Sequence, residues 1–533
     1  MSTPARRFDF VVVGAGSSGA VAARRLVDRF GEDVTVLLLE AGGPDSNPAI
    51  HEPVRMPETL GSADDWSYVT TPQAGAAGRQ LWWPRGKVLG GSSSLNGMIW
   101  VHGAPADYDH WAYLGNEGWA WEDVLPVFRA IEDFDGGASE HHGTGGYMHI
   151  TSRYPRLSSH EAIVAAAQEV GIAFNPDYNG PEIDGVSYIQ YNIKDGERLN
   201  TARAYLHTLP GDPRLVVETG SQVRRLLFAG DRCTGVELVR DGRPERVEAA
   251  CEVVVCAGAI GSPQLLMLSG IGPTDELRRL GIAPRLHLPG VGENLHDHLQ
   301  VPVILAASRP LDPVPPGGST VQTHLFWRSR SGLVAPDVQP IHYAGGIYFF
   351  NDWMSGPADA LTLGAGLIRP LSRGTIRLTG ATPEAPMLLD PAVLQCQADV
   401  DTILAATELC REIGAAPALR EWGATELYPG PDVRSRADLV DFIRRSVFTY
   451  HHQVGTCRMG RDPLAVVDAR LRVHGIAGLR VADASVMPVV PSGNTNAPCV
   501  MVGERVAAFI AEDHGGQVTR TAHAVAGEME VAR

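Results

Sequence analysis

The sequence predicts an α/β fold that begins with a nucleotide-binding unit, and three observations carry this prediction. An apolar run from Phe8 to Val13 is followed by a glycine-rich turn, and a helical pattern continues to Leu26. A second apolar run, Val34 to Leu39, ends at an acidic residue. This order of strand, turn, helix and strand is the start of a Rossmann-like domain. The chain has 533 residues, more than one hydrophobic core usually holds, so at least two domains are expected.

The turn has the pattern GxGxxG, in which each glycine has its own task. Gly14 makes the tight turn, Gly16 lets the backbone approach a pyrophosphate, and Gly19 lets helix and strand pack closely. The helix that starts beside Ser17 and Ser18 presents free N–H groups to the phosphates. The pattern therefore predicts a dinucleotide site.

An acidic residue at the end of the second strand supports the same prediction. Glu40, followed by Ala41, lies 21 residues after Gly19, near the spacing at which a carboxylate accepts hydrogen bonds from an adenosine ribose. The alternative is a glycine-rich structural turn followed by an exposed glutamate. Both strands and the helix favour the nucleotide site.

Composition is that of an ordinary soluble protein and excludes several classes. The net charge of −16 argues against binding to nucleic acid or to anionic membranes. No apolar run approaches the ~18 residues of a membrane span. The first predicted strand begins by Phe8 and leaves no room for a secretory signal, so a cytoplasmic protein is expected. Seven scattered cysteines without a CxxC pair predict reduced thiols and no metal site.

A second stretch of small residues lies between residues 86 and 96, with the sequence GKVLGGSSSLN. Such a density of glycine and serine indicates that the backbone must come close to something flat or phosphorylated. The alternative is a flexible linker, and the bulky neighbours Trp82, Trp83 and Trp100 argue against it.

Residues 86–96 resemble the first signature of the glucose-methanol-choline (GMC) oxidoreductases, which are FAD-dependent enzymes that oxidise alcohols. Residues 258–272 resemble the second signature of this family. The blocks 452–460, 479–485 and 493–498 are similar to its catalytic end. These motifs occur in the family order and extend the resemblance from Phe8 to about residue 510.

The resemblance implies a GMC oxidoreductase fold with two domains. The FAD-binding domain would be assembled from residues 1–155, 212–300 and 450–513, and the substrate domain, on a mainly antiparallel sheet with helices, from 156–211 and 301–449. Apolar runs at 214–218 and 251–258 fit buried strands of the first domain. Residues 309–319 are expected to form a mobile lid, and residues 514–533 a flexible tail.

The resemblance also implies noncovalent FAD. Choline oxidases of this family attach FAD through a histidine of the first signature, where this chain has Leu95. The positions that the resemblance and the turn motif assign to the cofactor are Gly14, Gly16, Ser17, Ser18, Gly19, Glu40, Ala41, Arg85, Val88, Gly91, Ser92, Asn96, Gly97, Val223, Ala257, Gly258, Asp483, Ala484, Asn494 and Thr495.

By resemblance, His452 is the catalytic base and Asn494 holds the substrate oxygen. The family usually has proline after this histidine, where the chain has Gln453, and His451 precedes it as an alternative base. A purely structural histidine is the remaining alternative. Asn496 is expected to cap a helix over residues 498–510.

The same resemblance bears on the substrate. His298 and His342 align with histidines that line the pocket of choline oxidases, and the alternative for both is a buried structural role. Choline oxidases have a glutamate facing the trimethylammonium where this chain has Gln300, which disfavours choline. Apolar side chains of the substrate domain are expected to favour an aromatic or aliphatic primary alcohol; they are Phe326, Trp327, Tyr348, Phe349, Phe350 and Trp353.

The predicted reaction is oxidation of this alcohol to the aldehyde, with proton abstraction by His452 and hydride transfer to flavin N5. Either oxygen or a separate acceptor reoxidises the flavin, and the motifs leave open which one it is, as they leave open the oligomeric state. The alternatives are a dehydrogenase with a non-oxygen acceptor, including choline- or polyol-type substrates, a non-redox hydroxynitrile lyase, and a flavin-binding protein without catalysis.

Overall fold

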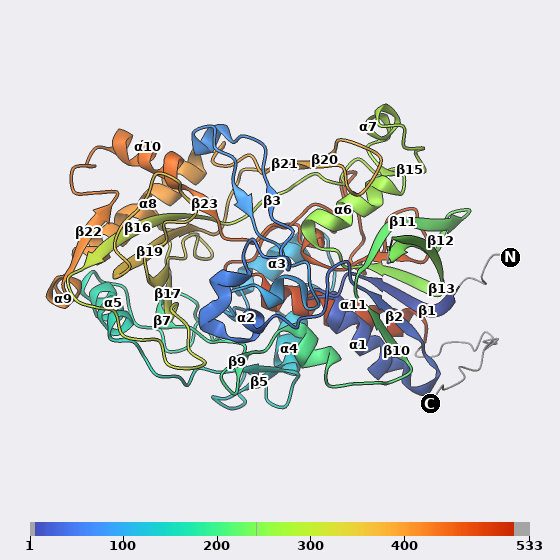
Figure 1. Cartoon of the computed structure of the whole chain (residues 1–533), viewed down its shortest axis with the longest axis horizontal. Coiled ribbons are helices and arrows are strands. Elements are labelled where there is room, and N and C mark those ends of the chain that lie inside the picture. The colour runs from blue at the N-terminus through green and yellow to red at the C-terminus, as the bar shows by residue number, and fades with distance from the viewer. Residues whose placement is uncertain (1–5, 241, 516–533) are drawn as a thin grey trace.

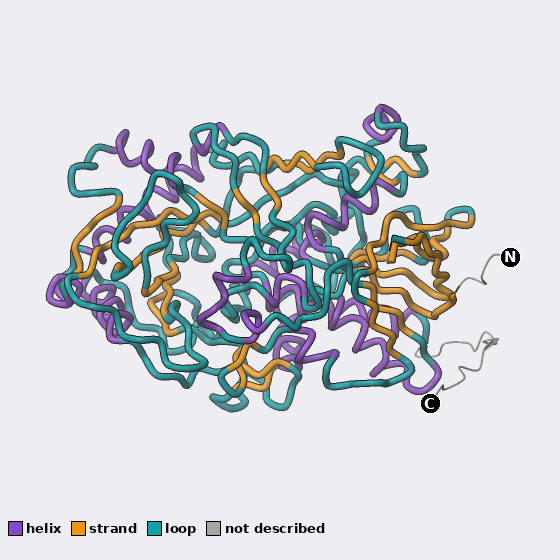
Figure 2. Tube along the Cα trace, in the orientation of Figure 1, coloured by secondary structure: helices purple, strands orange, loops and turns teal. Residues whose placement is uncertain are grey.

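A computed structural model describes residues 6–240 and 242–515 of the chain. Two seven-stranded sheets lie toward opposite ends of the long axis of the molecule, and short helices and loops fill the space between them (Figure 1). Figure 2 shows that much of this middle region is loop. The predicted α/β class with a second, antiparallel sheet is confirmed.

The first sheet contains the predicted nucleotide-binding strands. Its order is β10-β2-β1-β13-β12-β11, and β24 also pairs with β13. The strands are β1 (Arg6–Val13), β2 (Val36–Leu39), β10 (Leu215–Glu218), β11 (Ser221–Ala229), β12 (Arg232–Arg240), β13 (Arg243–Val255) and β24 (Leu479–Val481). β10, β2, β1, β13 and β24 run parallel, whereas β11 and β12 form an antiparallel extension. Residues 10–13 of β1, all of β2 and residues 253–255 of β13 are buried apolar runs, as strands covered on both faces require, whereas β10 at the edge is partly exposed.

Strand β13 belongs to both parts of this sheet. Residues 243–248 pair antiparallel with β12, and residues 247–249 and 252–255 pair parallel with β1. Residues 253–255 also pair with β24 from the far end of the chain. Strand β13 thus connects the antiparallel extension to the parallel part of the sheet.

Helices α1 (Gly19–Phe30) and α11 (Asn496–Asp513) pack together beside this sheet (Figure 1). The prediction that Asn496 caps the last helix is wrong, because α11 begins at Asn496 with Thr495 at the N-cap. The Asn496 side chain instead accepts a hydrogen bond from Ser17 Oγ at 2.9 Å. Asn496 therefore joins the starts of the two helices.

The second sheet is antiparallel throughout, in the order β22-β16-β19-β18-β17-β7 with β23 beside β16. Helices α5 (Ser158–Glu169) and α8 (Gln397–Gly414) pack against it. The strands are β7 (Gly185–Tyr188), β16 (Leu299–Ala307), β17 (Thr323–Phe326), β18 (Ile341–Ala344), β19 (Ala360–Leu367), β22 (Ala424–Tyr428) and β23 (Phe448–Thr449).

The remaining elements are short. The helices are α2 (Pro48–His51), α3 (Pro105–Tyr113), α4 (Trp121–Ile131), α6 (Gly258–Leu268), α7 (Thr274–Arg279), α9 (Pro417–Trp422) and α10 (Arg436–Ser446). Strand pairs are β3 (Tyr68–Val69) with β4 (Trp82–Trp83), β5 (Glu132–Phe134) with β6 (Met148–Ile150), β8 (Ile193–Lys194) with β9 (Glu197–Arg198), β14 (Ile271–Gly272) with β15 (Leu286–His287), and β20 (Thr375–Leu378) with β21 (Met387–Asp390).

Helix α5 and strand β7 join the second sheet, whereas residues 202–206 pack against α1 beside the first. The domain boundaries within residues 156–211 therefore remain a prediction. Residues 309–319 contain no helix or strand, and Gly317 lies against Gly196 in the turn between β8 and β9. Their role as a lid remains a prediction, and the predicted tail lies almost entirely outside the described residues.

A buried ionic cluster lies outside both sheets. Three ring nitrogens converge on the Glu132 carboxylate: Trp100 Nε1 at 2.7 Å, His102 Nε2 at 2.6 Å and His142 Nδ1 at 2.9 Å. Nε2 of His142 lies 3.2 Å from Asp177. Burial lowers the pKa of His142, but Asp177 and Glu132 outweigh burial and raise it to about 9. These are hydrogen-bond distances, and the cluster is an ion-pair network that joins four loops and strands.

Two further findings concern the chain as a whole. None of the helices within the described ranges is both long and apolar enough to cross a membrane. All seven cysteines are free thiols, as the sequence predicts.

Candidate active site

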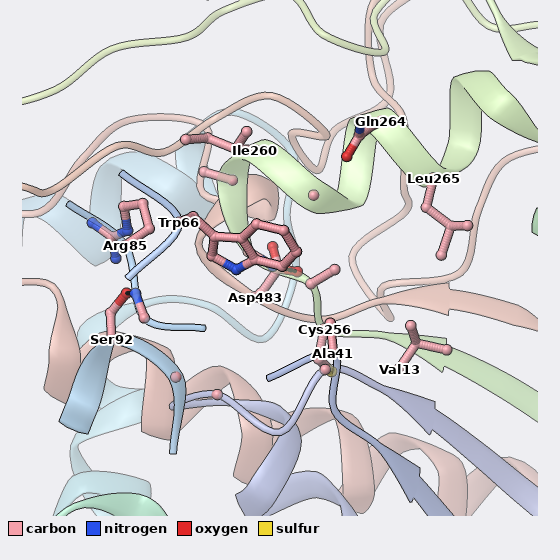
Figure 3. A pocket seen from close by; sticks show the side chains of 18 of the residues that line it. Val13, Ala41, Trp66, Arg85, Ser92, Cys256, Ile260, Gln264, Leu265 and Asp483 are labelled. Atoms are coloured by element: carbon pink, nitrogen blue, oxygen red, sulfur yellow. Dashed lines mark hydrogen bonds between the residues drawn. The ribbon is translucent and has the colours of Figure 1, made fainter. Parts of the chain in front are cut away.

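A pocket opens at the carboxyl ends of the parallel strands of the first sheet (Figure 3). It is lined by the glycine-rich turn after β1, by the ends of β2 and β13, and by the start of α6. Arg85 and Ser92 lie on one side of the pocket, and Asp483 lies behind the ring of Trp66 in this view (Figure 3). The carboxyl edge of a parallel sheet is where such folds bind dinucleotides.

Two glycine-rich segments meet in the pocket wall. A Cβ added to Gly91 would lie 2.6 Å from the Cα of Gly16, and Gly91 has a φ of +53°. A Cβ on Gly19 would lie 1.9 Å from the carbonyl oxygen of Gly14. The absence of side chains therefore lets two backbones approach each other and leaves free N–H groups at the start of α1.

Two acidic residues hold the loops of the pocket. Glu40 accepts hydrogen bonds from the N–H groups of Ala15 and Gly42 at 2.9 and 2.8 Å. Asp483 accepts from the N–H of Gly258 at 2.9 Å and from Ser262 Oγ at 2.5 Å. Both carboxylates are buried, and they fix the turns that follow β1 and β13.

Most of the predicted cofactor residues line this pocket. They are Gly14, Gly16, Ser17, Ser18, Glu40, Ala41, Arg85, Gly91, Ser92, Val223, Ala257, Gly258, Asp483 and Ala484. The other six are not among its lining residues: Gly19 packs behind the turn, Val88 lies in a small apolar cluster with Ile50 and Leu95, and Asn96, Gly97, Asn494 and Thr495 lie elsewhere.

Sequence reasoning missed several lining residues. Trp66 and Tyr68 stack with ring centroids 5.9 Å apart and line the pocket. Ile260, Gln264 and Leu265 line the pocket from α6 (Figure 3). Residues 41–78 show no clear helical or strand periodicity, so their aromatic residues are the only sequence signal for this part of the pocket.

The predicted catalytic pair comes together beside the second sheet. Nδ2 of Asn494 lies 3.3 Å from Nε2 of His452, although the two residues are 42 positions apart. Nδ1 of His452 lies 3.0 Å from Nδ1 of His298. The second imidazole candidate, His451, points elsewhere, because its φ of +66° turns the chain and its ring lies 5.6 Å from that of Phe350.

The turn that carries His452 is anchored by Asp297. This buried carboxylate accepts from the His452 N–H at 2.7 Å and from Gln453 Nε2 at 2.8 Å, and it also binds the Thr449 hydroxyl. Burial raises the pKa of Asp297 to about 7 against the effect of these donors. Gln453, where the family usually has proline, also accepts from Arg85 Nη1 at 2.8 Å. Gln453 therefore joins the turn to the pocket described above.

The imidazoles of this group are neutral. Burial lowers the pKa of His298 to about 3. Burial also lowers the pKa of His452 well below its ordinary value, and the neighbouring His298 lowers it further. A neutral imidazole with an unprotonated nitrogen is a base.

The register of the second sheet separates the two predicted pocket histidines. His342 lies opposite Thr323 and contacts its Oγ1 at 2.9 Å, and Thr323 also contacts His160 of helix α5. Successive side chains of a strand alternate between faces, so His342 lies on the helix-covered face and is not brought to His452. His324 follows Thr323 in β17 and therefore lies on the other face of the sheet. The sequence analysis did not identify His324 as a site residue.

Gln300 lies on the same face as His324, but its amide is already paired. Its Nε2 donates to the Gly364 carbonyl at 3.2 Å, and its Oε1 accepts from the Tyr343 hydroxyl at 3.0 Å. The side chain is buried and carries no charge.

Comparison with known proteins now adds to this geometry. Residues 8–300 and 370–503 match the two family models described as GMC oxidoreductase. The chain belongs to the GMC oxidoreductase family. The family's members are FAD-dependent oxidoreductases, and this chain is such an enzyme.

The relatives of this GMC oxidoreductase are named for different substrates. The chain is 39% identical to the mitochondrial choline dehydrogenase of Mus musculus, over 94% of this chain and 89% of that protein. It is 36% identical to an alcohol dehydrogenase [acceptor] of Pseudomonas putida, over 94% and 95%. The crystal structure of a pyridoxine 4-oxidase from Mesorbium loti superposes with a TM-score of 0.88 at 37% identity, over 94% and 98%. These relatives give no support to the hydroxynitrile lyase alternative.

The pocket fits the FAD that the family uses. The facing glycines, the start of α1 and Glu40 occur where a dinucleotide needs close backbone approach, free N–H groups and a carboxylate. Leu95 is buried in an apolar cluster and offers no atom for a covalent flavin bond.

Proposed function

We propose that this GMC oxidoreductase oxidises an uncharged primary alcohol to the aldehyde. The observation that carries the proposal is the pairing of His452 Nε2 with Asn494 Nδ2 at 3.3 Å. An alcohol oxygen within hydrogen-bond distance of both nitrogens would donate its proton to the imidazole and accept a hydrogen bond from the amide. FAD, when bound, supplies the acceptor for the hydride that leaves the carbon.

The chain's own residues would supply three functions. His452, kept neutral by burial, removes the hydroxyl proton. Asn494 holds the oxygen while its negative charge develops. Asp297 holds the backbone of the His452 turn through the hydrogen bond at 2.7 Å, which keeps the base in place.

The uncharged side chain of Gln300 supports an uncharged substrate. Gln300 occupies the position where choline oxidases have the glutamate that faces trimethylammonium, and both ends of its amide are paired within the sheet. A quaternary cation would be desolvated there without a matching charge, which is costly. The rings of Phe326 and Tyr450 lie 4.9 Å from His324 and 5.4 Å from His452, and these apolar neighbours support an aromatic or aliphatic alcohol.

A choline-type substrate is the second candidate, and the names of the relatives favour it. Two mammalian choline dehydrogenases are 39% and 38% identical to this chain. The electron acceptor is equally open, because the relatives include an alcohol dehydrogenase [acceptor] and an oxygen-dependent choline dehydrogenase.

The test is anaerobic bleaching of the flavin absorbance of the holoenzyme. Benzylic, aliphatic, polyol and amino alcohols, with choline among them, are added one at a time. Bleaching by an uncharged primary alcohol at a lower concentration than by choline is the expected result, and the reverse order would favour the second candidate. Return of the colour in air identifies an oxidase. No bleaching by any alcohol would contradict the proposal.

A further inference from the structure

A chain of five polar side chains, four of them buried, runs through the candidate site. Nε2 of Gln339 lies 3.1 Å from His324 Nδ1 and 3.1 Å from Asn494 Oδ1. Asn494 Nδ2 lies 3.3 Å from His452 Nε2, and His452 Nδ1 lies 3.0 Å from His298 Nδ1. The histidines and Gln339 are buried. Gln339 thus contacts Asn494 from the side opposite to the base.

The amide groups set the direction of every hydrogen bond in this chain. An amide nitrogen only donates, so His324 Nδ1 and His452 Nε2 must both accept. The remaining proton of His452 then lies on Nδ1 and is donated to Nδ1 of His298. This direction leaves the lone pair of His452 on Nε2, the nitrogen that faces Asn494, which is the tautomer a base needs.

The opposite direction is equally well paired but inactive. If both amides were turned over, Asn494 Oδ1 would face His452 Nε2, which would have to carry the proton. His452 would then have no lone pair to offer at Nε2. The orientation of one amide therefore selects between a competent and an incompetent imidazole.

Gln339 is well placed to hold the Asn494 amide, because its own backbone is held on both sides. Its N–H donates to the Gly366 carbonyl of β19 at 3.0 Å, and its carbonyl accepts from the Tyr450 hydroxyl. Its side-chain Oε1 is buried and has no hydrogen-bond partner among the described residues. The nitrogen, not the oxygen, is the end of this amide that the surrounding groups engage.

We propose that Gln339 is a positioning residue, which orients the Asn494 amide and thereby keeps the proton of His452 on Nδ1. This inference rests on the proposed function for its catalytic meaning. The tautomer itself can be measured without turnover, so the two can fail separately.

The decisive variant is Gln339→Glu. An ionised carboxylate can only accept, so it would turn the Asn494 amide over and reverse the chain, whereas a protonated carboxyl group can still donate to Asn494. The variant should therefore lose activity as the pH rises through the pKa of the new carboxyl group. The ionisable groups around that carboxyl group are His324, the Tyr450 hydroxyl on the backbone carbonyl, and His452 through Asn494.

The first measurement determines the tautomer of His452 by ¹⁵N NMR of histidine-labelled holoenzyme. The signal of His452 is the one that disappears in His452→Ala. The wild type should show the proton on Nδ1, and Gln339→Glu should show it on Nε2 at high pH. A wild-type proton on Nε2, or a variant that keeps the Nδ1 tautomer at every pH, would overturn the proposal.

The second measurement is the rate of flavin reduction by alcohol against pH. In Gln339→Glu the rate of flavin reduction should fall by about 10²-fold from low to high pH, which is the size of effect expected when a reacting group is misplaced. Gln322→Glu is the matched control, because Gln322 is an equally buried amide of the same sheet region that pairs with Leu157 and Pro155. If the rate falls equally with pH in Gln322→Glu, the loss of activity comes from burying a charge and not from the Asn494 amide, which would overturn the proposal.

A third variant covers the case in which the carboxylate prevents folding. Gln339→Met has a similar shape and no hydrogen-bonding amide, so it should keep FAD, lose about tenfold in the rate of flavin reduction with little change in KM, and show no new pH dependence. A wild-type rate in Gln339→Met would overturn the proposal. A wild type that no alcohol reduces but whose His452 carries its proton on Nδ1 would contradict the proposed function alone.

Discussion

His298 and His452 face each other through their Nδ1 atoms, 3.0 Å apart, with ring planes at 88°. Only one of these nitrogens can carry the hydrogen between them, because two N–H groups cannot point at each other. Burial lowers the pKa of both rings, so neither gains a second proton near neutral pH. The pair is therefore one donor and one acceptor, which links the state of His298 to that of the candidate base.

The first prediction separates His452 from His451. His452→Ala should keep FAD bound and lose at least about 10²-fold in the rate of flavin reduction, which is the contribution of a general base. His451→Ala should lose much less, since its ring lies beside Phe350 and not beside Asn494. Stopped-flow absorbance with a saturating alcohol measures both. Equal losses in the two variants, or near-normal reduction in His452→Ala, would contradict the assignment.

The second prediction concerns the contact between the glycine-rich segments. Gly91→Ala should abolish FAD binding, because the new Cβ would lie 2.6 Å from the Cα of Gly16 in the pocket wall. Gly230→Ala is the matched control, with a φ of +55° and no atom within 4 Å of the added carbon. The control should lose about 1 kcal/mol of stability from the same backbone strain and keep its flavin. Flavin content per protein after purification is the measurement, and full occupancy in Gly91→Ala would refute the role of this contact.

The third prediction tests the charge of the substrate site. Gln300→Glu places a carboxyl group where the buried amide now pairs with Gly364 and Tyr343. If this position faces the substrate, kcat/KM for choline relative to an uncharged alcohol should rise by about tenfold or more, equivalent to about 1.4 kcal/mol. The ratio is measured with both substrates in one preparation, so differences in flavin content cancel. An unchanged ratio would remove Gln300 from the proposed site.

The fourth prediction concerns the buried cluster around Glu132. The folded pKa of His142, about 9, is above the ordinary value of about 6.5, so its charged form stabilises the fold. This stabilisation is complete below pH ~6.5 and is lost as the pH rises through 9. His142→Gln should therefore lower the free energy of unfolding by about 3 kcal/mol at pH 6, and the difference from wild type should shrink by pH 10.

Urea denaturation of the holoenzyme at several pH values measures this difference. His149→Gln is the control, because His149 pairs with Asp133 at 3.0 Å but is partly exposed, so its loss should cost less than about 1 kcal/mol. A pH-independent effect of His142→Gln would show that the ring contributes by packing and not by charge.

Much of the fold and the pocket could be predicted because the relevant signals are local in sequence. The turn Gly14–Gly19 lies between a buried strand and a helix, and the later glycine stretch and Asp483 belong to compact motifs. These motifs fix backbone conformation within a few residues, so their placement follows from sequence order. Fourteen predicted cofactor residues accordingly line one pocket.

The rest depends on register and on long-range packing, which local patterns do not encode. His342 and His324 are equally plausible from the sequence, but a sheet turns alternate side chains to opposite faces, and the pairing of Thr323 with His342 assigns the latter to the helix side. The roles of Trp66 and Gln339 could not be predicted for the same reason, because each side chain meets its neighbours only when distant segments of the chain pack together. Asn496 was expected to be a cap because of its position, and a hydrogen bond to Ser17 determines its conformation instead.

Strand β24 (residues 479–481) has a consequence for the synthesis of the chain. It completes the parallel part of the first sheet beside β13, and Asp483 directly after it closes the pocket against Gly258. A ribosome has therefore made residues 1–478 before the pocket wall exists. FAD must load after β24 has been synthesised, and until then the exposed edge of β13 is open to incorrect pairing with other strands.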